Sequence, residues 1–162
     1  MSSDLELREL TAEELAHYVV YLEKSYADEM HRLGGLPQDV AQQNARESTV
    51  SLFPDGRPAE GHHLWRAVDG EGRAVGLLWL AHLRVGTAAE HAYVYDIEVE
   101  ATRRGQGWGR RLLEKAEAVA REWGVPSLQL NVFGDNDVAR ELYRSAGFRE
   151  QQVTMTKRLS AD

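Results

Sequence analysis

The 162-residue chain contains no cysteine. This absence excludes disulfide bridges, thiolate metal sites and a covalent acyl-cysteine intermediate. The chain also lacks any apolar run long enough to span a bilayer, and we expect no membrane partner. Its first residues, Met1–Asp4, have neither the basic nor the apolar region of a signal peptide. We therefore expect a cytoplasmic protein.

Positive charge is also in short supply. Lys and Arg total 19 against 26 Asp and Glu, which gives a formal net charge of −7. Because nucleic-acid phosphates favour basic surfaces, this balance argues against a nucleic-acid partner and suits a small cationic substrate. The six His show no ligand spacing, so no metal site is expected. With 43% hydrophobic residues, the chain is expected to form one globular domain over residues 1–162.

Hydrophobic periodicity and turn residues predict an alternation of helices and strands. Thr11 and Glu14 have the spacing of a capping box, which places the start of the first helix. The run Asp69-Gly70-Glu71-Gly72 indicates a hairpin turn, and residues 86–90 indicate a second turn. The predicted elements are strands over 5–10, 64–68, 74–84, 93–99, 127–133 and 148–159, and helices over 11–32, 39–52, 109–123 and 136–146.

The most informative segment is Arg104-Gly105-Gln106-Gly107-Trp108-Gly109, between a predicted strand and a predicted helix. Such a turn presents several backbone N–H groups to one point, with the helix dipole behind them, and so favours phosphate binding. A P-loop requires a Gly that is followed by Lys and then by Ser or Thr, and no Gly of this chain is followed in that way. The dinucleotide-binding pattern G-x-G-x-x-G/A can be aligned with this segment in two ways. Each alignment places a bulky residue at the last position, where the pattern requires Gly or Ala. The pattern that fits is R-x-x-G-x-G; an ordinary strand–helix connection with incidental arginines is the alternative.

The motif Arg104-x-x-Gly107-x-Gly109 resembles the acetyl-CoA signature of the GNAT superfamily of N-acetyltransferases. Further along, Asn136-x-x-Ala139-x-x-Leu142-Tyr143-x-x-x-Gly147-Phe148 resembles the second signature of that superfamily. The resemblance covers residues 93–159 well, and the earlier residues match only in expected layout. It implies an α/β (α+β) fold with a mixed, mostly antiparallel central sheet, splayed near its middle, and helices on both faces.

The resemblance also implies that acetyl-CoA donates its acetyl group directly to a primary amine of a small molecule, peptide or protein in a ternary complex. The pyrophosphate would sit on the amides of the glycine loop. The pantetheine arm would pair with the strand at 96–99, where a backbone N–H would stabilise the oxyanion. The cofactor-binding residues implied are Ile97, Glu98, Val99, Arg103, Arg104, Gly105, Gln106, Gly107, Trp108, Gly109, Arg110, Asn136 and Tyr143.

Acetylation of an amine needs a proton acceptor, because an alkyl ammonium with a pKa of about 10.4 is almost fully charged at pH 7. Asp96, Glu98 and Glu100 share one face of their predicted strand, opposite Ile97 and Val99. Glu98 and Asp96 are therefore the candidate bases, acting directly or through a water. A reaction that uses neither carboxylate stays open. The alternative is that this row of three acidic residues is only the solvent-exposed face of an edge strand.

By the resemblance, Tyr143 is the acid that protonates the departing thiolate; the alternative is a tyrosine that packs on Phe148. Acceptor recognition falls to the first half of the chain, where Tyr18, Tyr21 and Tyr26 either line the acceptor side or belong to the core. Two other functional classes remain: an inactive acyl-CoA-binding regulatory module and a nucleotide-binding protein for ATP or NAD. A homodimer that pairs through the final strand is also left open.

Overall fold

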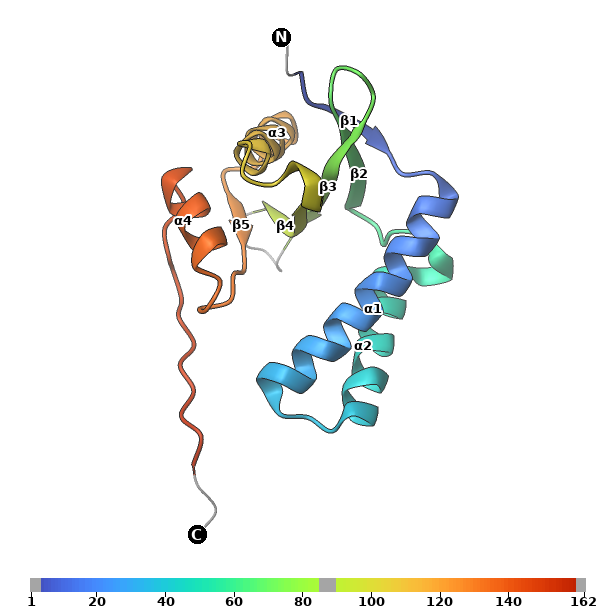
Figure 1. The fold of residues 1–162 in the computed structure, drawn as a ribbon, viewed down its shortest axis with the longest axis vertical. Helices are drawn as coiled ribbons and strands as arrows, with labels where there is room; N and C mark the ends of the chain where they lie inside the picture. Colours follow the sequence, from blue (N-terminus) through green and yellow to red (C-terminus); the bar gives the residue numbers. More distant parts are fainter. Residues whose placement is uncertain (1–3, 85–89, 160–162) are drawn as a thin grey trace. The chain divides into compact units, whose positions relative to one another are not determined.

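The structure, a computed structural model, describes residues 4–84 and 90–159. It divides into two compact units, Met1–Asn131 and Val132–Asp162. The first unit contains a five-stranded sheet in the order β1-β2-β3-β4-β5 (Figure 1). Its strands are β1 (Glu6–Glu9), β2 (His62–Val68), β3 (Ala74–Leu83), β4 (His91–Val99) and β5 (Leu128–Leu130). Its helices are α1 (Ala12–Gly34), α2 (Gln38–Leu52) and α3 (Trp108–Glu122), with 3-10 turns η1 (Pro54–Gly56) and η2 (Ala101–Arg103).

Local signals in the sequence set the ends of helix α1. The Glu14 N–H donates to Thr11 Oγ1 at 3.2 Å, and the Thr11 N–H donates to the Glu14 carboxylate at 2.9 Å, which confirms the capping box. Gly35 ends the helix in the left-handed region, at φ 64°. Across the described ranges, no helix has the length and apolar character that crossing a membrane requires.

Strand β4 controls the shape of the sheet near the site. It pairs antiparallel with β3, but the register shifts so that Trp79 faces Asp96 while Leu80 faces Val94, which makes Tyr95 the extra residue of a β-bulge. On its other side β4 pairs parallel with β5, over Ala92–Val94 only. Since β4 continues to Val99, its last residues extend past the β5 register. This divergence confirms the predicted splayed, mostly antiparallel sheet.

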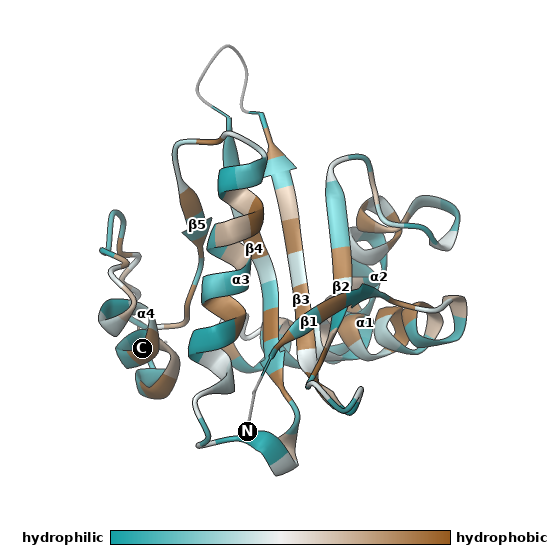
Figure 2. Ribbon diagram, turned by 90° about the horizontal axis from the view of Figure 1, so that it is seen from above, coloured by the Kyte–Doolittle hydropathy of each residue, from teal (hydrophilic) through white to brown (hydrophobic). Residues whose placement is uncertain are grey.

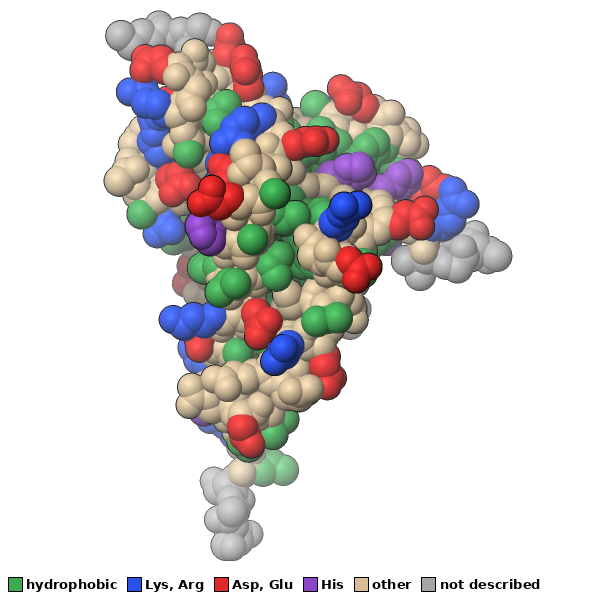
Figure 3. Space-filling view, turned by 90° about the vertical axis from the view of Figure 1, so that its right-hand side faces the viewer, with side chains coloured by type: hydrophobic (Ala, Val, Ile, Leu, Met, Phe, Trp, Pro, Cys, Tyr) green, Lys and Arg blue, Asp and Glu red, His purple; other side chains and the backbone are tan. Residues whose placement is uncertain are grey.

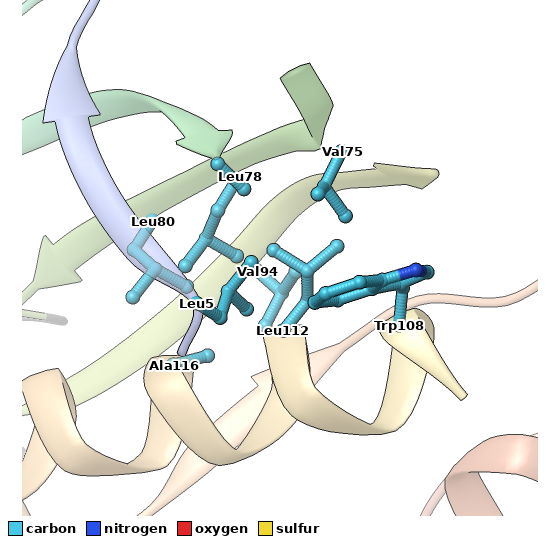
Figure 4. Close-up of a cluster of buried hydrophobic side chains, with 9 residues drawn as sticks. Leu5, Val75, Leu78, Leu80, Val94, Trp108, Leu112 and Ala116 are labelled. Atoms are coloured by element: carbon cyan, nitrogen blue, oxygen red, sulfur yellow. The ribbon is translucent and has the colours of Figure 1, made fainter. Parts of the chain in front are cut away.

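Helices cover both faces of this sheet, as the resemblance implied (Figure 2). On one face, Trp108, Leu112 and Ala116 of α3 pack against buried residues of the sheet, including Leu78 and Val94 (Figure 4). Each buried leucine contributes roughly 2 kcal/mol. On the opposite face, residues of α1 such as Tyr18 and Leu22 pack with Phe53, Leu64, Leu77 and Trp79. Strand β4 is therefore held between two cores.

The second unit contains one helix, α4 (Asp137–Ser145), among its described residues. The prediction of a final strand over 148–159 is wrong, because no part of this segment is in a strand. The Phe148 N–H instead donates to the Tyr143 carbonyl at 3.0 Å, and Glu150 pairs with Arg140 and Arg144. The segment thus begins by folding back on α4. The predicted turn over 86–90 lies, apart from Glu90, outside the described residues.

Candidate active site

The glycine loop has the backbone shape of an anion cradle. Gly105 and Gly107 have φ of 72° and 83°, a region that residues with a Cβ rarely adopt. Gly107 is the N-cap of α3, and its carbonyl accepts from the Arg111 N–H at 3.3 Å. Apart from chain neighbours, no heavy atom lies within 4 Å of a Cβ built on either glycine, so the loop has room for a phosphate group. Gly109, in contrast, lies in the first turn of α3.

Of the side chains around the loop, some pack in the core and others are exposed or bond the backbone. Trp108 is only 7% exposed and belongs to the core, with the guanidinium groups of Arg103 and Arg111 at 5.8 and 4.8 Å from its ring centre. The Gln106 side chain donates to the Thr102 carbonyl at 3.3 Å. Exposed Arg104 donates from Nε to the carbonyl of Val99, also at 3.3 Å. Arg104 is therefore the predicted arginine that links the loop directly to the end of β4.

Asp69 is a residue of this region that the sequence reasoning missed. Its buried carboxylate accepts from the N–H groups of Glu71 and Arg73 at 3.0 Å, and from the guanidinium groups of Arg73 and Arg103. Burial raises its pKa, but these hydrogen bonds outweigh burial and lower the pKa to about 2. Asp69 therefore ties the β2–β3 turn to η2. Its position before two glycines signalled the turn, but nothing local signalled Arg103.

The acidic residues of β4 face helix α1. The Tyr18 hydroxyl donates to Asp96 Oδ2 at 2.6 Å, and the Tyr21 hydroxyl donates to Glu98 Oε1 at 2.7 Å. Ile97 packs against the core on the α3 side, as the predicted alternation requires. Because both carboxylates accept hydrogen bonds from tyrosines of α1, this face of β4 is not simply solvated, although β5 does not extend alongside these residues. The structure confirms that both carboxylates share one face of the strand, but sequence reasoning did not find the tyrosines that bond them.

Burial and neighbouring charge perturb the protonation of this cluster. Burial, together with the charge of Glu98, raises the pKa of Asp96 to about 7, although the hydrogen bonds from Tyr18 and the Ile97 N–H act in the opposite direction. The hydrogen bond to Glu98, and then burial, raise the pKa of Tyr21 to about 12. Burial also raises the pKa of Glu29 above its usual value. Asp96 is thus a carboxyl group that changes charge near neutral pH.

Two adjoining clefts meet at Glu98. The first, of about 280 Å³, lies along α1 and includes Tyr18. The second, of about 260 Å³, extends to Val99 and Arg104, beside the glycine loop. Both clefts are lined by Tyr21, Arg66, Leu77 and Glu98. On the face of the molecule shown in Figure 3, acidic and basic side chains are interspersed and do not form a surface of one sign.

Of the remaining predicted residues, Arg110 is exposed in the first turn of α3, and Asn136 and Tyr143 belong to the cap and the body of α4. Asn136 caps this helix, since its Oδ1 accepts from the Ala139 N–H at 3.1 Å. Tyr143 lies in the last two turns of α4, half-buried, with its ring centre 5.8 Å from that of Phe148. Tyr143 therefore packs on Phe148, as the alternative to a catalytic role predicted. In the described part of the chain, no group of three or more His, Asp or Glu is arranged to hold a metal ion.

Comparison with known proteins shows the family of the chain. Residues 20–148 match the model of the acetyltransferase (GNAT) family. The chain belongs to this GNAT family. Its GNAT relatives include the uncharacterized N-acetyltransferase YycN of Bacillus subtilis, which is 35% identical over 94% of this chain and 97% of its own length. YdgE of the same organism, also an uncharacterized N-acetyltransferase, is 26% identical over 94% of this chain and 97% of its own length.

Solved GNAT structures have the same fold. The crystal structure of YycN from Bacillus subtilis gives a TM-score of 0.87 at 32% identity, covering 98% of this chain and all of the other. Aminoglycoside N-acetyltransferase AAC(6')-Iy, solved in complex with CoA, gives a TM-score of 0.60 at 17% identity and covers 99% of this chain and 98% of its own. At that identity it shows the fold alone. As a GNAT protein, the chain is an N-acetyltransferase that depends on acetyl-CoA.

Proposed function

We propose that this enzyme transfers an acetyl group directly from acetyl-CoA to a primary amine, on a small molecule or on a peptide or protein. The observation that carries the proposal is the position of Glu98, which lines both the cleft along α1 and the cleft beside the glycine loop. A carboxylate at this junction can accept a proton from the amine as its nitrogen approaches the thioester.

Acetyl-CoA would bind along the second cleft. Its pyrophosphate would accept hydrogen bonds from the backbone of residues 104–110, and Arg104 and Arg110 would add positive charge. Its pantetheine arm would pair with β4 beyond Val94, where the β5 register ends. A backbone N–H between Ile97 and Val99 would then stabilise the oxyanion. AAC(6')-Iy, which has this fold, supports the assignment because it was solved with CoA.

The proposed reaction needs one base and one acid. Glu98, with Asp96 behind it, accepts the proton of the ammonium, and the neutral nitrogen attacks the acetyl carbon. When the tetrahedral intermediate collapses, the carbon–sulfur bond breaks, and Tyr143 donates its phenolic proton to the thiolate. The nitrogen loses the extra proton that it carries after the attack, and the Tyr143 phenolate takes up a proton from solvent, which leaves a neutral amide and restores the phenol. Asn136 would contact the pantetheine arm in addition to capping α4.

Three further assignments belong to the same proposal. We place both compact units in a single domain over residues 1–162, supported by a family match that runs through both of them. We place the enzyme in the cytoplasm. A homodimer stays a prediction that light scattering after size-exclusion chromatography would test.

The first experiment is a thermal shift with acetyl-CoA, CoA, ATP and NAD in parallel. A ligand at about a hundred times its Kd stabilises the folded state by roughly 2.7 kcal/mol, which is a shift of several degrees for a chain of this size. We expect shifts with acetyl-CoA and CoA but not with NAD. Stabilisation by NAD or ATP alone would refute the assignment of the loop. Binding without turnover across a panel of amines would support a regulatory module instead.

Substitutions then separate binding from chemistry. Glu98→Gln should lower kcat/KM for the amine by about a hundredfold or more, since it removes a general base. Tyr143→Phe should lower kcat while the affinity for acetyl-CoA changes little. Tyr26→Phe, on the same helix as the cleft tyrosines, is the matched control for loss of a hydroxyl group. An unchanged rate in Tyr143→Phe would remove that residue from the mechanism.

A further inference from the structure

Helix α1 and strand β4 are joined by two hydrogen bonds between side chains. Tyr18 and Tyr21 are three residues apart, so they lie on one side of the helix. Asp96 and Glu98 are two residues apart, so they lie on one face of the strand. The donor–acceptor distances are 2.6 Å for Tyr18–Asp96 and 2.7 Å for Tyr21–Glu98. Each tyrosine thus bonds one of the two candidate bases.

We propose that Tyr18 and Tyr21 are positioning residues that hold the Asp96 and Glu98 carboxylates, so that α1 orients the proton acceptors of the reaction. This inference rests on the proposed function and deepens it, since it extends the machinery from β4 to the helix that lines the acceptor cleft. Neither tyrosine needs to contact the acetyl group. Each acts through the carboxylate that it bonds.

The two bonds differ in their surroundings. Tyr18 is 6% exposed, and its ring packs edge-on against Trp79 with ring centres 6.2 Å apart, so its hydroxyl has little freedom to move away from Asp96. Tyr21 is 49% exposed and borders both clefts. A cationic amine that enters the first cleft therefore meets the Tyr21–Glu98 bond first. The Tyr18–Asp96 bond lies further into the core.

The groups that act on Asp96 come from several elements. Tyr18, Tyr26 and Glu29 belong to α1, and Glu98 belongs to β4. On β2, His62 accepts from Trp79 Nε1 at 3.1 Å, and burial lowers its pKa, so it brings no positive charge near neutral pH. A phenol that donates to a carboxylate stabilises the charged form. The Tyr18 hydroxyl is thus the group of α1 that favours ionised Asp96.

The test is a carbon-13 NMR titration of the Asp96 carboxyl in the free enzyme, assigned with Asp96→Asn. Tyr18→Phe should move the titration upward by about one pH unit, because the ionised form loses a charge-assisted hydrogen bond. Tyr26→Phe removes a hydroxyl two turns further along α1, whose pKa burial raises to about 12. This hydroxyl acts on Asp96 only when it is ionised, so its loss should leave the midpoint nearly unchanged. An unchanged midpoint in Tyr18→Phe would overturn the inference.

Kinetics give a second readout. The acid limb of the kcat/KM profile for the amine should move upward in Tyr18→Phe, so that the rate falls about fivefold at pH 7 and recovers near pH 9. In an Asp96→Asn background, Tyr18→Phe should have almost no further effect, because the partner is gone. A loss that multiplies in the double variant would indicate a merely structural tyrosine and overturn the inference.

Tyr21→Phe provides a version of the test at an exposed position, where loss of a hydroxyl does not threaten folding. It should lower kcat with unchanged acetyl-CoA affinity, and it should add nothing in a Glu98→Gln background. If Tyr21→Phe lowers kcat as much in the Glu98→Gln background as in the wild-type enzyme, the proposed role of Tyr21 is refuted. The NMR titration requires neither acetyl-CoA nor an amine. A failure of the proposed function, seen as absent CoA binding, is therefore distinguishable from a failure of this inference.

Discussion

The two sides of the candidate site are assembled differently. On the proposed cofactor side, Val99, Arg104 and Gly107 follow one another closely along the chain, and backbone torsions of the glycines shape the loop. On the acceptor side, Asp96 and Glu98 bond tyrosines that lie 78 and 77 residues earlier in the sequence. The cofactor side thus depends on local conformation. The acceptor side depends on how α1 packs on the sheet.

The sharpest way to break the cofactor side is Gly107→Trp. The new side chain would occupy the space in front of the loop and would force a residue with a Cβ into φ 83°. We expect the Kd for acetyl-CoA, measured by calorimetry, to rise at least a hundredfold, or by about 3 kcal/mol.

Gly72→Trp is the matched control, because Gly72 also has a positive φ, of 77°, but lies in the β2–β3 turn. It should cost similar backbone strain and leave the Kd nearly unchanged. Tight binding that survives in Gly107→Trp would mean that the pyrophosphate sits elsewhere.

Gly76→Ala should weaken both sides at once, because β3 and β4 approach very closely there. A Cβ on Gly76 would lie 2.0 Å from the Glu98 carbonyl oxygen, so the backbone would have to move. We expect the free energy of unfolding to fall by about 2 kcal/mol in urea titrations. Gly34→Ala at the end of α1, where the nearest atom is a leucine side-chain carbon at 3.8 Å, should be close to neutral. Equal stabilities for the two variants would contradict the close approach.

Asp96→Asn probes the acceptor side through pH. The folded state raises the pKa of Asp96 to about 7, so it holds the proton more tightly than the unfolded chain does. Wild-type stability should therefore fall as pH rises from about 4 to 7, while the variant escapes this loss. Because Asp96 is only partly buried, we expect the variant to gain about 1 kcal/mol on wild type over this interval. A constant difference in urea unfolding from pH 4 to 8 would argue against the raised pKa.

Much of the fold could be predicted from the sequence because the residues that specify it are close together along the chain. The Thr11–Glu14 capping box uses side chains three residues apart, and this prediction is confirmed. The Asn136 cap, which the structure shows, is equally local. The alternating faces of β4 follow from strand geometry, and the structure confirms them too. These features need no knowledge of distant residues.

The prediction of a final strand over 148–159 failed because a strand needs a neighbouring strand with which to pair. Val153, Met155 and Leu159 alternate as in a strand, but they are 66%, 91% and 83% exposed, because a strand exists only where another strand accepts its hydrogen bonds. The bulge at Tyr95 was also unreadable, since it arises from the register between β3 and β4. The roles assigned to Tyr143 and Asn136 remain predictions.

By itself, the sequence determined the family, the glycine-rich loop before α3 and the strand that carries the acidic residues, because each depends on neighbouring residues through torsions, caps and periodicity. Only the tertiary structure decided that Asp69 binds Arg103 and that Tyr18 and Tyr21 bond the two carboxylates. Contacts across such separations depend on the packing of whole elements. The spacing of residues along a chain does not specify that packing.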